Sequence, residues 1–186
     1  MQRTRSAWLG TLLLVATLGT AAADPMAAAR SEFMVAYQRV GTPAAEAAED
    51  SDRLRGYPLY PYLQAARLLP RLEDPAAAAE IEAFLATHGS APVSRSLRRA
   101  WLMSLARREA WEPYLAAYLE EVDDSTAARC NTLAARVALG RVDGLAEAVT
   151  ETYLSPRSLP PACDPAFDWL RSQGRLTADL IERRAR

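Results

Sequence analysis

The segment 74–105, DPAAAAEIEAFLATHGSAPVSRSLRRAWLMSL, decides the fold class because two complete helix signals follow one another in it. Asp74 before Pro75 is a typical helix start, since an aspartate caps free N–H groups and proline fits the first turn. Gly89 is a typical helix end, and Pro92 begins a second helix. The apolar residues at helical spacing are Ile81, Phe84 and Leu85, then Leu97, Trp101, Leu102 and Leu105. The segment therefore predicts two amphipathic helices joined by a short turn.

The same pattern, apolar residues at helical spacing interrupted by glycine or proline, extends over the rest of the chain. It predicts about ten mostly short helices, near residues 25–39, 43–54, 58–69, 75–88, 92–105, 111–119, 125–140, 143–154, 164–174 and 177–186. Ser125, Asp143 and Asp164 are expected to cap the helices that follow them. No convincing stretch alternates apolar and polar residues, so no sheet is predicted. Such helix pairs stack either as a bundle or as an α-solenoid, and the chain lacks the strict period of a regular tetratricopeptide array.

Residues 1–23 have the three parts of a cleavable secretory signal peptide. Arg3 and Arg5 give a positive start, residues 7–18 are nearly all apolar, and alanines 21–23 form a small-x-small cleavage site. We expect cleavage after Ala23, which leaves residues 24–186 as the mature, periplasmic domain. The alternative is an uncleaved membrane anchor, but the apolar run is shorter than the roughly 20 residues of a spanning helix. No second apolar run follows, so the mature chain is not expected to span a membrane.

Composition narrows the class of function. The chain has 186 residues, of which 50% are apolar, so the mature part fits one domain with an ample core. Two of the 22 basic residues lie in the signal, which leaves 20 against 23 acidic residues. A mildly acidic protein of this kind lacks the concentrated basic face that nucleic-acid binding requires, and we expect no nucleic-acid partner.

The two cysteines, Cys130 and Cys163, are expected to pair in an oxidising compartment. A disulfide closing the loop between them would stabilise the fold by roughly 3–4 kcal/mol. The alternatives are two buried free thiols or a metal site. His88, the single histidine, is far away in sequence, which disfavours a metal site.

A search for catalytic residues finds no Gly-rich phosphate loop, no histidine-based nucleophile and no cluster of metal ligands, so no cofactor is expected. His88 precedes a helix-ending glycine, where it is expected to interact with the last carbonyls of its helix. The acidic run of Glu120, Glu121, Asp123 and Asp124 is expected to be a solvated surface at a helix end. Glu109 and Glu112 flank Trp111 and are expected on the outer face of their helix. Tyr57 and Tyr60 lie on a loop or a helix start, where they are candidates for contact with a ligand.

Four segments, in order, resemble the periplasmic soluble lytic murein transglycosylases. LRGYPLYPYL, residues 54–63, is similar to a segment of their large N-terminal helical region, and LARREAWEPYL, 105–115, resembles one of their helix pairs. ARCNTLAARVALGR, 128–141, and LPPACDPAFDWLRSQGRL, 159–176, are similar to their two cysteine segments. The likeness covers the chain from about Val40 onward. The residues of the first motif are Leu54, Arg55, Gly56, Tyr57, Pro58, Leu59, Tyr60, Pro61, Tyr62 and Leu63.

This resemblance implies an irregular α-superhelix of stacked helix pairs, which in the family is part of a U-shaped or ring-shaped scaffold. It also implies a Cys130–Cys163 disulfide. The parent enzyme would cleave peptidoglycan glycan strands between N-acetylmuramic acid and N-acetylglucosamine, leaving a 1,6-anhydro end. In the family, one glutamate of a C-terminal lysozyme-like domain acts as acid and then base within a Glu-Ser motif. No Glu-Ser pair occurs here, so no catalytic residue is assigned and the chain alone is predicted to be inactive.

The C-terminal end of the chain and its function allow more than one interpretation. The last predicted helix runs to Arg186 without a C-cap glycine, a proline or a polar tail, and this pattern predicts a domain truncated at its C-terminal end. The leading hypothesis is therefore the non-catalytic helical part of a lytic transglycosylase, whose catalytic domain is missing. The alternatives are a free-standing periplasmic helical-repeat protein that binds a protein or cell-wall glycan, and an enzyme with an unfamiliar site among surface carboxylates such as Glu109 and Glu112.

Overall fold

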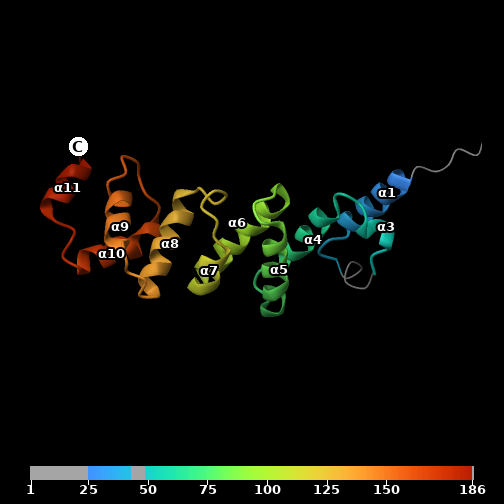
Figure 1. Ribbon diagram of the computed structural model, residues 1–186, viewed down its shortest axis with the longest axis horizontal. Coiled ribbons are helices and arrows are strands. Elements are labelled where there is room, and N and C mark those ends of the chain that lie inside the picture. Colours follow the sequence, from blue (N-terminus) through green and yellow to red (C-terminus); the bar gives the residue numbers. More distant parts are fainter. Residues whose placement is uncertain (1–24, 43–48, 186) are drawn as a thin grey trace, which may run out of the picture.

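The computed structural model describes residues 25–42 and 49–185, and the predicted signal peptide, 1–23, lies outside the described residues. All regular elements within these ranges are helical, which confirms the prediction of an all-α fold without a sheet. The helices follow one another along the long axis, with α1 near one end and α11 at the other (Figure 1). The α-helices are α1 (Pro25–Gln38), α3 (Asp52–Arg55), α4 (Tyr60–Leu68), α5 (Ala78–His88), α6 (Pro92–Arg107), α7 (Trp111–Ala117), α8 (Thr126–Ala138), α9 (Leu145–Tyr153), α10 (Asp164–Ser172) and α11 (Ala178–Ala185). The 3₁₀ turns are η1 (Leu69–Arg71), η2 (Pro75–Ala77) and η3 (Pro161–Cys163).

The helix pair predicted from residues 74–105 is present as α5 and α6. The Asp74 side chain accepts a hydrogen bond from the Ala76 N–H at 2.9 Å, and Pro75 begins the turn η2 that leads into α5. Gly89 ends α5 with a positive φ of 46°, a conformation that favours glycine. Pro92 then begins α6, which has 16 residues. Local capping signals thus place both ends of this pair.

Three predicted helix starts differ from the structure. The predicted helix 43–54 begins outside the described residues, and residues 49–51 are not helical, since the Ser51 hydroxyl caps the short α3 by accepting from the Leu54 N–H. Asp143 does not cap α9, because the chain turns at Gly144 in the left-handed region and Asp143 lies one residue before the cap position. Asp164 is the first residue of α10 rather than its cap, since η3 leads directly into that helix.

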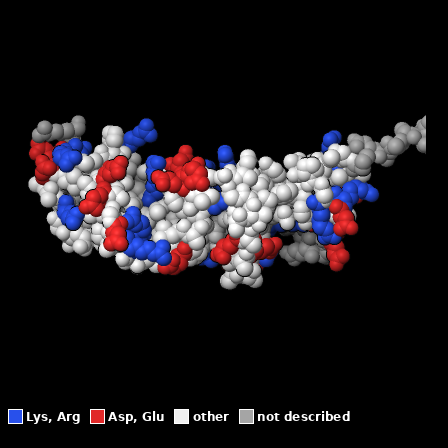
Figure 2. Space-filling view, in the orientation of Figure 1, with Lys and Arg blue, Asp and Glu red and all other residues white. Residues whose placement is uncertain are grey.

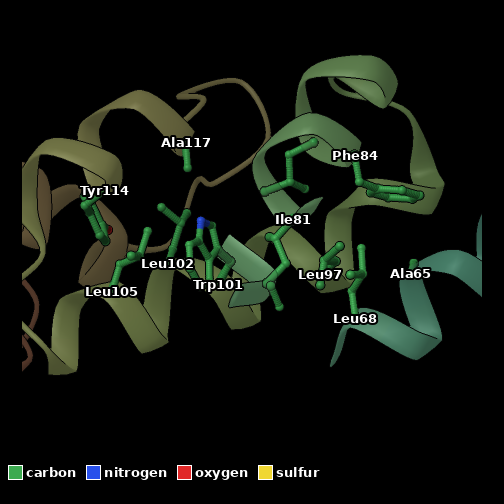
Figure 3. Packing of buried hydrophobic residues seen from close by; sticks show 12 residues of the cluster. Ala65, Leu68, Ile81, Phe84, Leu97, Trp101, Leu102, Leu105, Tyr114 and Ala117 are labelled. Atoms are coloured by element: carbon green, nitrogen blue, oxygen red, sulfur yellow. The ribbon is translucent and has the colours of Figure 1, made fainter. Parts of the chain in front are cut away.

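The buried apolar side chains form three clusters in succession along the molecule. The N-terminal core joins α1, α3 and α4; the central core joins α4 to α7; the C-terminal core joins α8 to α11. Trp101 of α6 lies in the middle of the central core, 1% exposed, between Ile81 of α5 and Tyr114 of α7 (Figure 3). Burial of such side chains stabilises each helix pair by roughly 2–3 kcal/mol per large residue. Each cluster therefore covers the apolar faces of neighbouring helices, as expected for a stack of helix pairs.

No helix among the described residues is both long enough and apolar enough to cross a membrane.

Candidate functional site

The segment 54–63, which carries the first motif of the sequence analysis, contains the end of α3, the turn after it and the start of α4. Leu54 is buried, and the ring of Tyr57 lies 5.3 Å from that of Phe33 in α1 and is 9% exposed. Tyr57 is therefore part of the N-terminal core and offers no open face to a ligand. Leu59 and Tyr62 are the large apolar residues of the motif that remain exposed.

Asp50, Tyr60 and Arg67 form a hydrogen-bonded cluster beside this segment, here called the Asp50 tie, which the sequence did not reveal. The Arg67 guanidinium donates two hydrogen bonds to the Asp50 carboxylate, at 2.7 and 2.9 Å, and the Tyr60 hydroxyl donates a third at 2.8 Å. The bond from Arg67, with a smaller contribution from Tyr60, lowers the pKa of Asp50 below its ordinary value although burial acts in the opposite sense. Burial and the neighbouring carboxylate raise the pKa of Tyr60. The Tyr60 hydroxyl thus holds α4 against the segment before α3 and is not free for a ligand.

The two cysteines form a disulfide between α8 and η3. Both Cys130 and Cys163 are fully buried, and their Cα atoms are 4.6 Å apart. The bond lies inside the C-terminal core, where Ala166 and Leu170 of α10 are also fully buried. It links two segments separated by 33 positions and fixes η3 on α8.

The candidate catalytic and metal-binding residues of the sequence analysis do not lie together in one site. The rings of His88 and Phe84 are in contact along α5, tilted by 44° with centroids 4.3 Å apart, and no hydrogen bond from His88 to a helix carbonyl is present. Glu109 is exposed with a positive φ of 53°, and Glu112 pairs with Arg141 at 2.6 Å. Both are exposed, as predicted, but only Glu112 lies on a helix, since Glu109 is in the turn between α6 and α7. Within residues 25–42 and 49–185, no group of histidine, cysteine, aspartate or glutamate side chains has the arrangement of a metal site.

The acidic run departs from its prediction at one position. Glu120, Glu121 and Asp124 are exposed, but Asp123 is only 8% exposed. Its Oδ2 atom accepts a hydrogen bond from the Leu119 N–H at 3.0 Å, which draws the side chain into the loop before α8. Burial raises the pKa of Asp123, and the bond from Leu119 and the charges of Arg98 and Arg99 oppose that shift.

Arg98 is a second buried charge that the sequence analysis missed. Its guanidinium donates to the Ala117 carbonyl at the end of α7 and to the Gly89 carbonyl at the end of α5, both at 2.6 Å. Arg98 is 3% exposed, and burial lowers its pKa. The side chain therefore satisfies the carbonyls of two helix ends at once. Its position beside Leu97 and Trp101, on the apolar face of α6, was the sequence signal for a buried cation.

Two of the concave regions between the helices lie against α8. A groove of about 490 Å³ lies between α8 and α9 and is rich in hydroxyl groups. Its lining includes Tyr118, Arg129, Thr132, Glu151, Thr152 and Ser155. A cleft of about 320 Å³ lies between α6 and the start of α8, with an apolar wall of Leu102, Met103 and Tyr114 and with Arg99, Asp123 and Asn131 around it.

The visible surface carries no extended patch of one charge. Arginines and acidic residues are interspersed on the face drawn in Figure 2, and broad uncharged areas separate them. Ten ion pairs occur among the described residues, and most are exposed. A concentrated basic face of the kind that binds nucleic acid is not present on this side.

The known proteins to which this chain is similar in sequence include soluble lytic murein transglycosylases of two bacteria. The chain is 32% identical over 122 residues to soluble lytic murein transglycosylase of Salmonella typhimurium and, equally, to that of Escherichia coli K12. The match covers 66% of this chain and 19% of each relative, so the chain spans about a fifth of their length. No family model matches.

Solved structures agree with the sequence relatives. The 70-kDa soluble lytic transglycosylase in complex with bulgecin A superposes with a TM-score of 0.71 at 29% identity, over 87% of this chain and 26% of that one. The Escherichia coli enzyme at 1.65 Å resolution gives 0.70 at 27% identity over the same shares of both chains. An inactive mutant of the Pseudomonas aeruginosa lytic transglycosylase Slt gives 0.64 at 29% identity, over 80% of this chain. The resemblance and the α-superhelical arrangement inferred from the sequence are confirmed.

Proposed function

We propose, from the homology of this chain to a part of the soluble lytic murein transglycosylases, that it is the non-catalytic scaffold of a peptidoglycan-cleaving enzyme. The observation that carries the proposal is a continuous stack of helix pairs that superposes on one of those enzymes over 87% of this chain and 26% of that one. A stack of this kind offers an extended surface along which a polymer can lie.

The scaffold would shape the enzyme and help guide glycan strands to a catalytic domain. The groove between α8 and α9 suits this role, because Tyr118 supplies an aromatic wall beside hydroxyl-bearing side chains. In this proposal residues 1–23 direct the chain to the periplasm as a cleaved signal, and residues 24–186 are the scaffold. The lysozyme-like catalytic domain would be supplied outside these residues.

The test is incubation of the purified chain with isolated peptidoglycan sacculi. We expect the chain to sediment with the sacculi and to release no soluble 1,6-anhydro muropeptides. Glycan strands stripped of their peptides, used in parallel, measure the contribution of the sugars alone. Lytic activity of the chain by itself would contradict the scaffold role, and failure to sediment with either material would contradict the role in guiding strands.

Coding sequence after codon 186 separates the scaffold proposal from a free-standing binding protein. A lysozyme-like reading frame downstream supports a scaffold derived from an enzyme. An unrelated downstream sequence, together with a protein partner recovered at defined stoichiometry, supports the free-standing alternative.

A further inference from the structure

Two aromatic rings of α9 and α10 hold an arginine that comes from α11. The guanidinium carbon of Arg184 is 4.4 Å from the ring centroid of Tyr153 and 5.8 Å from that of Phe167. The two rings are themselves in edge-to-face contact, with centroids 5.2 Å apart. Aromatic faces attract cations, and a guanidinium group stacks on them well because it is planar and weakly hydrated. Tyr153 and Phe167 thus form a site for one arginine side chain, here called the arginine site.

The arginine site also offers a hydrogen-bond acceptor at the end of a helix. Arg184 donates from Nη1 to the Tyr153 carbonyl at 2.9 Å. Tyr153 is the last residue of α9, and the last carbonyls of a helix have no partner within it. The guanidinium therefore receives a stacking surface and a helix-end carbonyl at the same place, a combination that a lysine could use only in part.

α11 has few other means of staying on the α9–α10 pair. It is the outermost helix at its end of the molecule (Figure 1). Leu180 is the one buried residue among the eight of α11, and Ile181 beside it is 48% exposed. Isolated helices of this length are marginal in water, so the docking of α11 depends on Leu180 and Arg184. Elements with so little buried surface open locally at a low cost in free energy.

α11 also leaves part of the arginine site unfilled. A depression of about 370 Å³ remains there, lined by both rings, by Arg184 and by Asp164 and Asp168 of α10. Both carboxylates are exposed, and the ion pair of Asp168 is with Arg171 rather than with Arg184. A larger basic ligand that used the same two rings would therefore find additional space and negative charge beside them.

We propose that the arginine site binds an arginine-bearing helix of a partner protein, and that α11 occupies this site as an intramolecular competitor. The chemistry of the ligand follows from its present occupant. Leu180 enters the C-terminal core, and Arg184, four positions later on the same helix face, enters the arginine site. A partner helix with the same two anchors binds by replacing α11, so the docked fraction of α11 sets the apparent affinity. This inference concerns a protein partner and is independent of peptidoglycan binding.

The test is a competition in which α11 is supplied as a separate peptide. A peptide of residues 177–186, blocked at both ends, is titrated into the full chain, and the amide NMR signals of α9 and α10 report where and how tightly it binds. The released chain carries Leu180→Ser with Arg184→Gln and should bind the peptide. The unsubstituted chain should bind it at least about 10-fold more weakly, because the tethered α11 competes at a high effective concentration.

Matched substitutions isolate the guanidinium group. The peptide with Arg184→Gln should bind the released chain about 10-fold more weakly than the original peptide, whereas the peptide with Arg183→Gln should bind it unchanged. Arg183 is the exposed neighbour of Arg184 on α11. In the full chain, Arg184→Gln alone should speed hydrogen exchange of α11 by about 10-fold, and Arg183→Gln should leave it unchanged.

Each result decides one part of the proposal. Equal affinity of the unsubstituted and released chains would show that α11 does not compete for the site. Absence of binding to the released chain, or equal binding of the two substituted peptides, would overturn the arginine site itself. If the released chain does not fold, the chain with Arg184→Gln alone replaces it, because Leu180 then remains in the C-terminal core, and the same comparisons apply.

Discussion

The α8–α11 end and the α1–α4 end of the molecule are held together by different interactions. At the α8–α11 end, the disulfide between Cys130 and Cys163 lies within a cluster of ten buried residues. At the α1–α4 end, the cluster contains only five buried residues, and the tie of Arg67 and Tyr60 to Asp50 supplements it. Because each part of a helical stack contacts mainly its neighbours, the two ends should lose structure separately and under different conditions.

Removal of the disulfide should have the largest effect on this difference. The double substitution Cys130→Ala and Cys163→Ala opens a loop of 33 positions and should lower the free energy of unfolding by roughly 3–4 kcal/mol. Urea denaturation measures the total loss, and hydrogen exchange localises it. Exchange should accelerate in α8–α11 and remain as before in α1–α4. Uniform acceleration along the whole chain would mean that the two ends unfold as one unit.

Loss of the Asp50 tie should act at the opposite end. Asp50→Asn leaves the partly buried guanidinium of Arg67 without its charged partner and should lower stability by about 2 kcal/mol. Faster hydrogen exchange is expected in α1, α3 and α4. The control is Asp52→Asn, whose carboxylate is fully exposed, and its effect should be negligible. If Asp50→Asn were as stable as this control, the hydrogen bonds of Asp50 to Arg67 and Tyr60 would not contribute to the free energy of unfolding.

Acid should separate the partly buried Asp50 from the buried Asp123 by the sign of their effect on stability. The pKa of Asp50 is lowered, so its contribution to stability is present above the ordinary aspartate value and is lost as the pH falls through the folded value. The pKa of Asp123 is raised, so its contribution is present below the ordinary value and is lost as the pH rises through the folded value. Denaturation measured from pH 3 to pH 7 should therefore give Asp50→Asn and Asp123→Asn opposite pH dependences relative to the unsubstituted chain. Parallel curves would contradict the assigned environments.

The smallest effect is expected at an exposed ion pair between the two ends. Glu112→Gln breaks the contact of α7 with Arg141, in which both side chains are at least half exposed. Such pairs contribute about 0.2–1 kcal/mol, and salt screens them. Thermal melting at low and at high salt should show a small shift that disappears at high salt. A shift that persists at high salt would indicate a packing role for Glu112.

The fold was predictable where its signals are local. Asp74, Pro75, Gly89 and Pro92 define the α5–α6 pair by their own backbone preferences, and the structure contains that pair at the predicted place. The start of α9 was misplaced by one residue, because Asp143 was predicted to be the cap, whereas the chain enters the helix through a left-handed turn at Gly144.

The features of the candidate sites were harder to predict because they depend on tertiary packing. Asp50 and Arg67 are 17 positions apart, and nothing in either local sequence indicates that they meet. Asp123 belongs to an acidic run that reads as solvated surface, and only the hydrogen bond from Leu119 shows that one of the four carboxylates is drawn inward. Arg98 was missed as well, although its place beside Leu97 and Trp101 on the apolar face of α6 is a local signal for burial.

The disulfide also sets how far the molecule can be stretched. An extended chain spans about 3.3–3.6 Å per residue, so the 33 positions between Cys130 and Cys163 amount to about 110 Å of contour length that a force applied at the two termini cannot release. Under such a load the segment between the two cysteines could not extend, whereas α1 to α7, α10 and α11 lie outside the closed loop and could. A reducing agent would return those 110 Å to the chain, which makes the bond a limit on extension as well as a source of stability.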